Sequence, residues 1–134
     1  MKLEINWKQK SLENLEKKDE GNPSADYTSL VNNVLKLRKI PLNQFSVENL
    51  RLMIGQNEGL RYLIVLSLDI LKDDLFADGD FYPGDLLQNV LKAPTTFWIE
   101  HKELWEAVDS LIKDRVEEIS EHGISSQIFY DITI

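Results

Sequence analysis

The segment from Phe45 to Leu71 contains the densest run of apolar residues in the chain, and it constrains the fold more than any other segment. Its second part, Leu60 to Lys72, reads LRYLIVLSLDILK. At 100° per residue the apolar side chains cover roughly two-thirds of the helix circumference, and Arg61, Asp69 and Lys72 share a narrow stripe with Val65. A helix of this length is too short to span a bilayer. The segment is therefore predicted to form the central, largely buried helix of the fold.

A second helix is predicted immediately before the central one. Ser46 is a suitable N-cap for it, and Gly55 and Gly59 bracket a polar connection of the kind that ends a helix. Within the central helix, Ser67 falls inside the apolar arc. Such a serine usually donates a hydrogen bond to the carbonyl four residues earlier, so a structural role is expected for it.

Helical spacing recurs on the N-terminal side of this pair. Ser11 is predicted to cap a short helix anchored by Leu12 and Leu15, and Ser24 is predicted to cap a longer helix that ends at about Arg38. Ile40-Pro41 follows, where proline disfavours further helix. The buried face of the longer helix is expected to consist of its apolar residues, Leu30, Val31, Val34, Leu35 and Leu37.

The C-terminal half shows the same period. Residues 86–91 predict one helix, and residues 97–120 keep helical spacing with a break near His101. The last residues, 124–134, alternate imperfectly and could form a strand or an extended arm on the bundle. Together these patterns predict an all-α protein. We expect one domain over residues 1–134, a single compact bundle of about five to seven helices with a short extended or strand-like C-terminal tail.

Acidic residues are distributed unevenly along the chain. The formal net charge is −8, yet residues 1–60 carry nine Lys and Arg against eight Asp and Glu, whereas residues 61–134 carry six against fifteen. An acidic surface repels nucleic acid and attracts a basic protein, so direct nucleic-acid binding is not expected. The alternative is that the surplus acid only keeps a small protein soluble.

The chain contains no cysteine, which excludes a disulfide framework, a thiolate nucleophile and a Cys-ligated zinc site. The first 20 residues carry charges too closely spaced for the apolar core of a signal peptide, and no later stretch is predicted to span a membrane. We therefore expect a cytoplasmic protein without a membrane partner.

Six aspartates occur from position 69 to position 85, in the sequence DILKDDLFADGDFYPGD. Calcium binding is one interpretation, but no frame supplies the alternating ligands, central glycine and twelfth-position glutamate of an EF-hand. Asp78-Gly79-Asp80 is also typical of an ordinary tight turn, which is the interpretation that we favour. The aromatic residues of the loop are expected to anchor it on the core: Phe76, Phe81 and Tyr82.

The sequence offers no recognised metal or phosphate motif. His101 and His122 lack the HExxH spacing of zinc ligands, and neither GxSxG nor a glycine-rich phosphate loop occurs. Asp73/Asp74 or Asp78/Asp80 could serve as acid and base in a small hydrolase, but nothing in the sequence indicates the pocket that such a pair needs. The sequence therefore predicts a non-enzymatic protein with no cofactor and no metal.

Several segments together carry a resemblance to a known family. The most specific are LRLMIGQ at residues 50–56 and YPGDLL at residues 82–87. The others are SLENLE at 11–16, then residues 35–38, 41–42 with 45–49, 59–60 with 62–63, 79–80, 94 and 97–98. On these residues the chain resembles the small helical immunity proteins of bacterial contact-dependent growth inhibition (CDI) systems. The resemblance covers residues 11–105, and residues 121–134 have no counterpart.

The resemblance implies an all-helical antitoxin that binds and blocks the toxic C-terminal domain delivered by a neighbouring cell, often a nuclease. A nuclease grips phosphates with a cationic cleft, which an acidic protein can fill. The matching residues are mostly apolar or turn-forming, so specificity is expected in exposed charged and aromatic residues of the Asp-rich loop, the acidic last helix or the unmatched tail. The alternative is a regulatory or adaptor module that binds another basic protein. The candidate toxin-binding residues are Asp73, Asp74, Asp78, Asp80, Tyr82, Asp85, Glu103, Glu106, Asp114, Glu117, Glu118 and Glu121.

Overall fold

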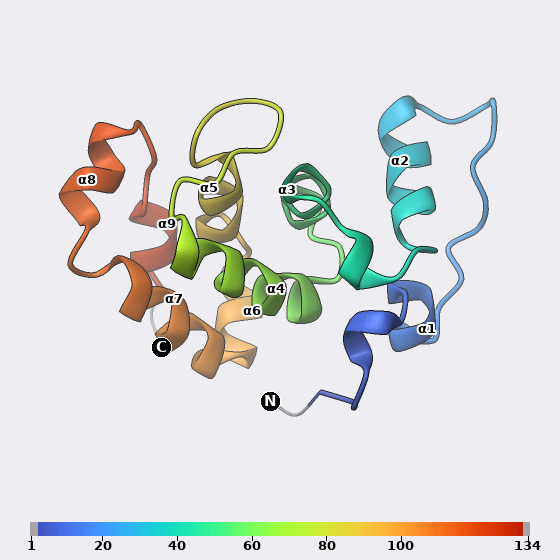
Figure 1. Cartoon of the computed structure of the whole chain (residues 1–134), viewed down its shortest axis with the longest axis horizontal. Coiled ribbons are helices and arrows are strands. Elements are labelled where there is room, and N and C mark those ends of the chain that lie inside the picture. The colour runs from blue at the N-terminus through green and yellow to red at the C-terminus, as the bar shows by residue number, and fades with distance from the viewer. Residues whose placement is uncertain (1–2, 133–134) are drawn as a thin grey trace.

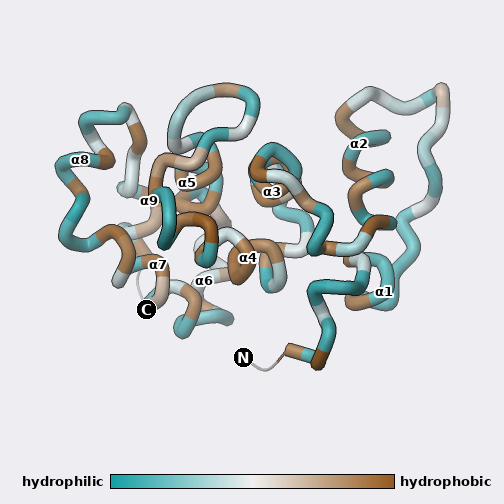
Figure 2. Tube along the Cα trace, viewed as in Figure 1, coloured by the Kyte–Doolittle hydropathy of each residue, from teal (hydrophilic) through white to brown (hydrophobic). Residues whose placement is uncertain are grey.

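The computed structural model describes residues 3–132, and helix α4 (Leu60–Asp73) lies at the centre of the molecule (Figure 1). It contacts α3 (Val47–Gly55), α5 (Asp85–Leu91) and α7 (Lys102–Ile112). Hydrophobic residues recur along α4 and α5 in the middle of the trace, whereas much of α8 is polar (Figure 2). The predicted position of the central helix is confirmed. Its buried residues are Leu60, Tyr62, Leu63, Ile64, Ser67, Leu68 and Leu71.

Local sequence explains how α3 and α4 begin. The Ser46 hydroxyl accepts a hydrogen bond from Asn49 N–H, and the Asn49 side chain accepts one from Ser46 N–H, so the two form a capping box. Gly59 precedes α4 with φ +60°, and a Cβ there would lie 2.6 Å from the Leu12 side chain. Ser67 Oγ donates to the Leu63 carbonyl at 2.8 Å, as predicted.

The N-terminal end consists of short helices. They are η1 (Trp7–Gln9), α1 (Leu12–Glu16), α2 (Ser29–Leu37) and η2 (Leu42–Gln44). Ser11 caps α1, and Leu12 and Leu15 are buried, as predicted. The expected start of α2 is wrong, because Thr28 and not Ser24 caps it; Ser24 N–H instead donates to the Asn32 side chain.

The expected buried face of α2 is also only partly right. Leu35 is buried, and Val34 and Leu37 pack partly against the core. Leu30 and Val31 are 41% and 43% exposed. Apolar spacing identified the side of the helix that faces the core. The neighbouring helices cover only part of that side.

The C-terminal end differs most from expectation. The helical pattern of residues 97–120 is divided into α6 (Thr95–Glu100), α7 and α8 (Val116–Glu121), with the predicted break at His101. The expected strand or extended arm is wrong for residues 127–130, which form a short helix, α9. Phe129 of α9 is fully buried, with its ring centre 5.2 Å from that of Trp98 and 5.0 Å from that of Trp105. This aromatic cluster, rather than a strand partner, holds the tail.

The all-α class is confirmed. Within residues 3–132 there are nine α-helices and two 3-10 helices, more than the five to seven expected, because several helices have only four to six residues. The same part of the chain contains no strand, only an isolated bridge between Asp78 and Pro83. None of its helices is long and apolar enough to cross a membrane.

Candidate protein-binding site

The loop between α4 and α5, residues 74–84, is organised around the carboxylate of Asp85 at the start of α5. Asp85 Oδ1 accepts a hydrogen bond from Gly79 N–H (2.7 Å), and Oδ2 accepts one from Phe81 N–H (3.1 Å). Asp85 is only 2% exposed. A buried carboxylate is costly unless it is hydrogen-bonded, so these two bonds and the loop conformation depend on each other.

Two residues of α3 hold the tip of the same loop. Arg51 donates to both carboxylate oxygens of Glu48 at 2.6 Å, and Glu48 Oε1 accepts a hydrogen bond from Asp80 N–H at 2.8 Å. The hydrogen bonds from Arg51 hold the pKa of Glu48 below its usual value against the effect of burial, and Asp80 N–H acts in the same direction. Arg51 Nε also lies 3.8 Å from Asp85 Oδ2. The loop tip is therefore fixed to α3 through the hydrogen bond between Asp80 N–H and Glu48.

The aromatic residues of the loop differ in burial. Phe76 packs partly against the core, as expected. The expectation for Phe81 and Tyr82 is wrong, because they are 68% and 44% exposed. Asp85 binds Phe81 N–H from the inside, and the Phe81 ring lies outside over Arg51, whose guanidinium carbon is 4.2 Å from the ring centre. Exposed aromatic residues on an ordered loop are typical of contact residues in protein interfaces.

The loop lies beside the last helices, although they are far apart in sequence. The Phe76 ring stacks on the ring of His122, with centres 3.7 Å apart, and the Arg115 guanidinium is 5.7 Å from the Phe76 ring centre. Gln88 of α5 exchanges two hydrogen bonds with the backbone of Ser125, at 3.0 and 2.9 Å. These contacts place the Asp-rich loop and the acidic helix α8 on neighbouring parts of the surface.

Gly84 makes this approach possible. Its φ is +90°, and a Cβ at this position would collide with Ile124 Cδ1 of the segment that follows α8. The Gly84 N–H donates to the Phe76 carbonyl at 3.1 Å and closes the base of the loop. A glycine is required here both by the backbone conformation and by the close contact.

The structure separates the candidate residues by exposure. Among the candidates in the loop and at its two ends, Asp85 is buried and positions the backbone, whereas the others are exposed: Asp73, Asp74, Asp78, Asp80 and Tyr82. At the turn between α7 and α8 the carboxylates line a surface hollow of about 510 Å³ together with Lys113, Arg115 and Val116; they are Asp114, Glu117, Glu118 and Glu121.

Not every acidic candidate is available to the same degree. Glu118 accepts a hydrogen bond from Arg115 Nε at 2.7 Å, which lowers the pKa of Glu118. Glu103 and Glu106 are exposed on α7, whose other side buries Leu104 and further core residues. Neither of them lines the hollow at the α7–α8 turn, and a carboxylate oxygen of Glu103 is 3.9 Å from His101 Nδ1.

Sequence reasoning missed Glu48 and Arg51. No motif connects them with the loop, because they lie more than 20 residues before it and act through tertiary contact. The exposed pair Phe81-Tyr82 had a usable signal in the sequence, since it stands between aspartates, glycines and a proline rather than in an apolar run.

In the described part of the chain, no group of three or more His, Cys, Asp or Glu residues could hold a metal ion. The surface offers charge and aromatic side chains for contact with another molecule.

Comparison with known proteins matches the chain to a protein family. The family model described as CDI immunity proteins matches residues 14–108, which is most of the chain and contains the whole Asp-rich loop. Helix α8 and the tail lie outside the matched residues. No curated protein and no solved structure matches the chain.

Proposed function

This chain belongs to the CDI immunity proteins, which neutralise toxins in contact-dependent growth inhibition, and from this premise we propose that it blocks a nuclease toxin by covering a basic active site with its acidic second half. The protein acts by binding and not by catalysis, and it does so in the cytoplasm of the cell that it protects. Neither the toxin nor its substrate is modified in this mechanism.

The observation that carries the proposal is the fixed loop tip beside α8. Asp78 and Asp80 are exposed next to Phe81 and Tyr82, and the backbone of this tip is held by Asp85 and by α3. A partner can therefore contact charge and aromatic area without first ordering the loop. Because ordering costs free energy on binding, a preformed contact surface favours affinity.

The charges of the second half provide complementarity to a cationic cleft. Fifteen Asp and Glu residues stand against six Lys and Arg after residue 60. Such a charge difference speeds the association with a basic partner. Ion pairs that are desolvated at the contact slow the dissociation of the complex. We therefore expect association to slow steeply as the salt concentration rises, whereas dissociation changes less.

Two pairs of charge reversals test the two acidic surfaces. Asp78→Lys with Asp80→Lys alters the loop, and Glu117→Lys with Glu118→Lys alters α8. At least one of the two double variants should weaken the complex with the cognate toxin domain. The loss is several kcal/mol where a buried charge pair is broken, and it is mainly slower association where the charges lie at the rim of the contact. The measurements are surface plasmon resonance at low and high salt and rescue of cells that express the toxin.

A matched control has the same change in net charge at exposed acids outside both surfaces. Glu4→Lys with Glu100→Lys serves this purpose. The proposal is wrong if both test pairs bind and protect like wild type in low and high salt. It is also wrong if the control pair weakens binding as much as they do, because net charge alone would then explain the effect.

A further inference from the structure

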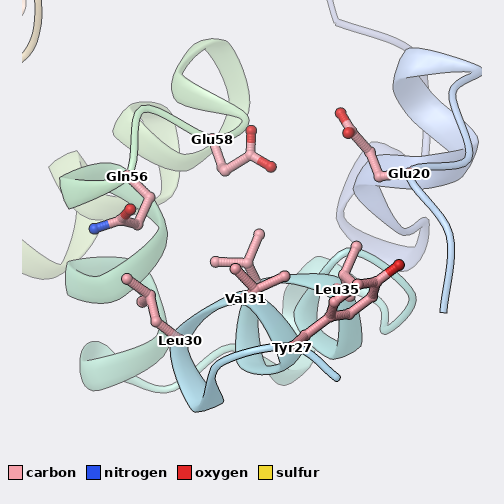
Figure 3. A pocket seen from close by; sticks show the side chains of 8 residues that line it. Glu20, Tyr27, Leu30, Val31, Leu35, Gln56 and Glu58 are labelled. Carbon is pink, nitrogen blue, oxygen red and sulfur yellow. The ribbon is translucent and has the colours of Figure 1, made fainter. Parts of the chain in front are cut away.

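The side of α2 that faces the turn between α3 and α4 carries apolar side chains that the rest of the described chain covers only in part. They face the turn between α3 and α4 across a hollow of about 410 Å³ (Figure 3). Leu30, Val31 and Tyr27 are each between 41% and 50% exposed there. We call this hollow the α2 groove; it is lined by Glu20, Tyr27, Leu30, Val31, Val34, Leu35, Gln56 and Glu58.

Carboxylates stand at opposite sides of the α2 groove. Glu58 comes from the turn before α4 and Glu20 from the loop before α2, and their carboxylates approach the groove mouth from opposite directions (Figure 3). Burial raises the pKa of Glu58, Arg38 lowers it, and the negative charges of Glu20 and Glu16 raise it further. The negative charge of the carboxylates around the groove is therefore only partly balanced by positive charge.

The nearby cations are already engaged. Arg38 is buried, with Nη1 2.8 Å from Glu16 and 3.7 Å from Glu58, and Lys18 Nζ lies 3.4 Å from Glu20. Three carboxylates therefore share two cations around an apolar hollow. A cationic group brought by a partner would be attracted to the mouth, while an aliphatic side chain would lose water in the hollow.

The other side of α2 adjoins the Asp-rich loop. A second hollow, of about 300 Å³, is lined by Asn33, Lys36 and Leu37 of α2 and reaches Asp80 at the loop tip. Glu48 of α3, which binds Asp80 N–H, lines it as well. One partner of ordinary domain size could therefore contact the loop tip and α2 together.

We propose that the α2 groove is a second docking surface for the toxin, and that it takes a toxin segment in which an aliphatic side chain stands next to a lysine or arginine. This inference rests on the proposed function, because it assigns the same partner to both surfaces. A second copy of this chain is disfavoured as the occupant, since the net charge of −8 opposes self-association.

Hydrogen exchange of the wild-type protein, free and in complex with the cognate toxin domain, locates the contact directly. The proposal requires slower exchange in residues 27–35 and 56–58 on complex formation. Slower exchange in residues 76–85 and 113–121 alone would overturn it, while the proposed function would stand. Failure of the wild-type protein to bind the toxin domain would overturn both.

Substitutions then measure the contribution of the groove. Val31→Lys places a charge in the apolar wall, and its control, Ile99→Lys, makes the same change at a side chain of α6 with a similar exposure of 44%. Glu20→Gln with Glu58→Gln removes the carboxylates, and Glu100→Gln is its control at an exposed glutamate. Circular dichroism and urea midpoints confirm that each variant is folded.

The expected result is a Kd raised by about tenfold or more for Val31→Lys, and by about threefold or more for the double glutamine variant, with the controls within about twofold of wild type. Equal affinity of all variants would overturn the inference and leave the proposed function intact. The inference is also overturned if sedimentation shows that the free protein is a dimer which Val31→Lys dissociates, because a second copy would then occupy the groove.

Discussion

Asp85→Asn is the substitution that tests how the candidate site is built. It keeps the size of the side chain but replaces one of the two acceptor oxygens by an NH2 group. Since Asp85 accepts hydrogen bonds from both Gly79 N–H and Phe81 N–H, one of these donors must then face another donor. The loop tip then keeps only one of its two hydrogen bonds to residue 85, while the rest of the fold is unchanged.

The expected cost follows from the contacts that are lost. A hydrogen bond to a charged group contributes about 1.5–3 kcal/mol, and the remaining bond falls to the neutral range of about 0.5–1.5 kcal/mol. Asp85 is also in the first turn of α5, where a negative charge adds about 0.3–1 kcal/mol. We expect Asp85→Asn to lower the free energy of unfolding by about 2–4 kcal/mol, a large part of the total for a domain of this size.

Urea unfolding gives the stability change, and hydrogen exchange of residues 79–81 reports on the loop. Asp78→Asn is the matched control, because it makes the same chemical change at an exposed position of the same loop. Its effect should stay below about 0.5 kcal/mol. If Asp85→Asn costs no more than this control and leaves exchange at Gly79 and Phe81 unchanged, the carboxylate does not hold the loop.

Three further predictions concern the core, the tail and the response to acid. Leu63→Ala, at a fully buried position, should lower the free energy of unfolding in urea by about 2–5 kcal/mol. Leu66→Ala, at a partly exposed position of the same helix, should lower it clearly less. Equal losses would contradict the difference in packing between the two positions. Phe129→Ala should lower the free energy of unfolding by about 3–5 kcal/mol and shift tryptophan fluorescence to the red, because Trp98 and Trp105 lose the ring that packs against them. An unchanged spectrum would contradict the role of this aromatic cluster in holding α9. Because the pKa of Glu48 is lowered in the folded protein, its contribution is present above its ordinary pKa and is lost as the pH falls through the lower folded value. Glu48→Gln should therefore lose less stability than wild type below about pH 4.5, and parallel acid unfolding curves would refute the assignment.

The sequence determined the elements whose causes are local. The apolar arc of residues 60–72 predicted the central helix, and Ser11 and Ser46 marked two helix starts, because side-chain period and capping act within a few residues. The back-bond of Ser67 to Leu63 was predictable for the same reason. The family, too, was recognisable from the spacing of short segments, and its match over residues 14–108 confirms the resemblance.

Only the tertiary structure decided which surfaces are covered and which are presented. An apolar stripe on α2 does not reveal that its neighbours cover one edge alone, because that depends on where α3 and α4 lie. The loop tip turns outward because Glu48 and Asp85, far apart in sequence, bind its backbone N–H groups. Residues 127–130 of the tail form a helix whose Phe129 ring packs against Trp98 and Trp105. Burial and hydrogen bonding between distant segments set these outcomes, and a local pattern carries no information about which segments meet.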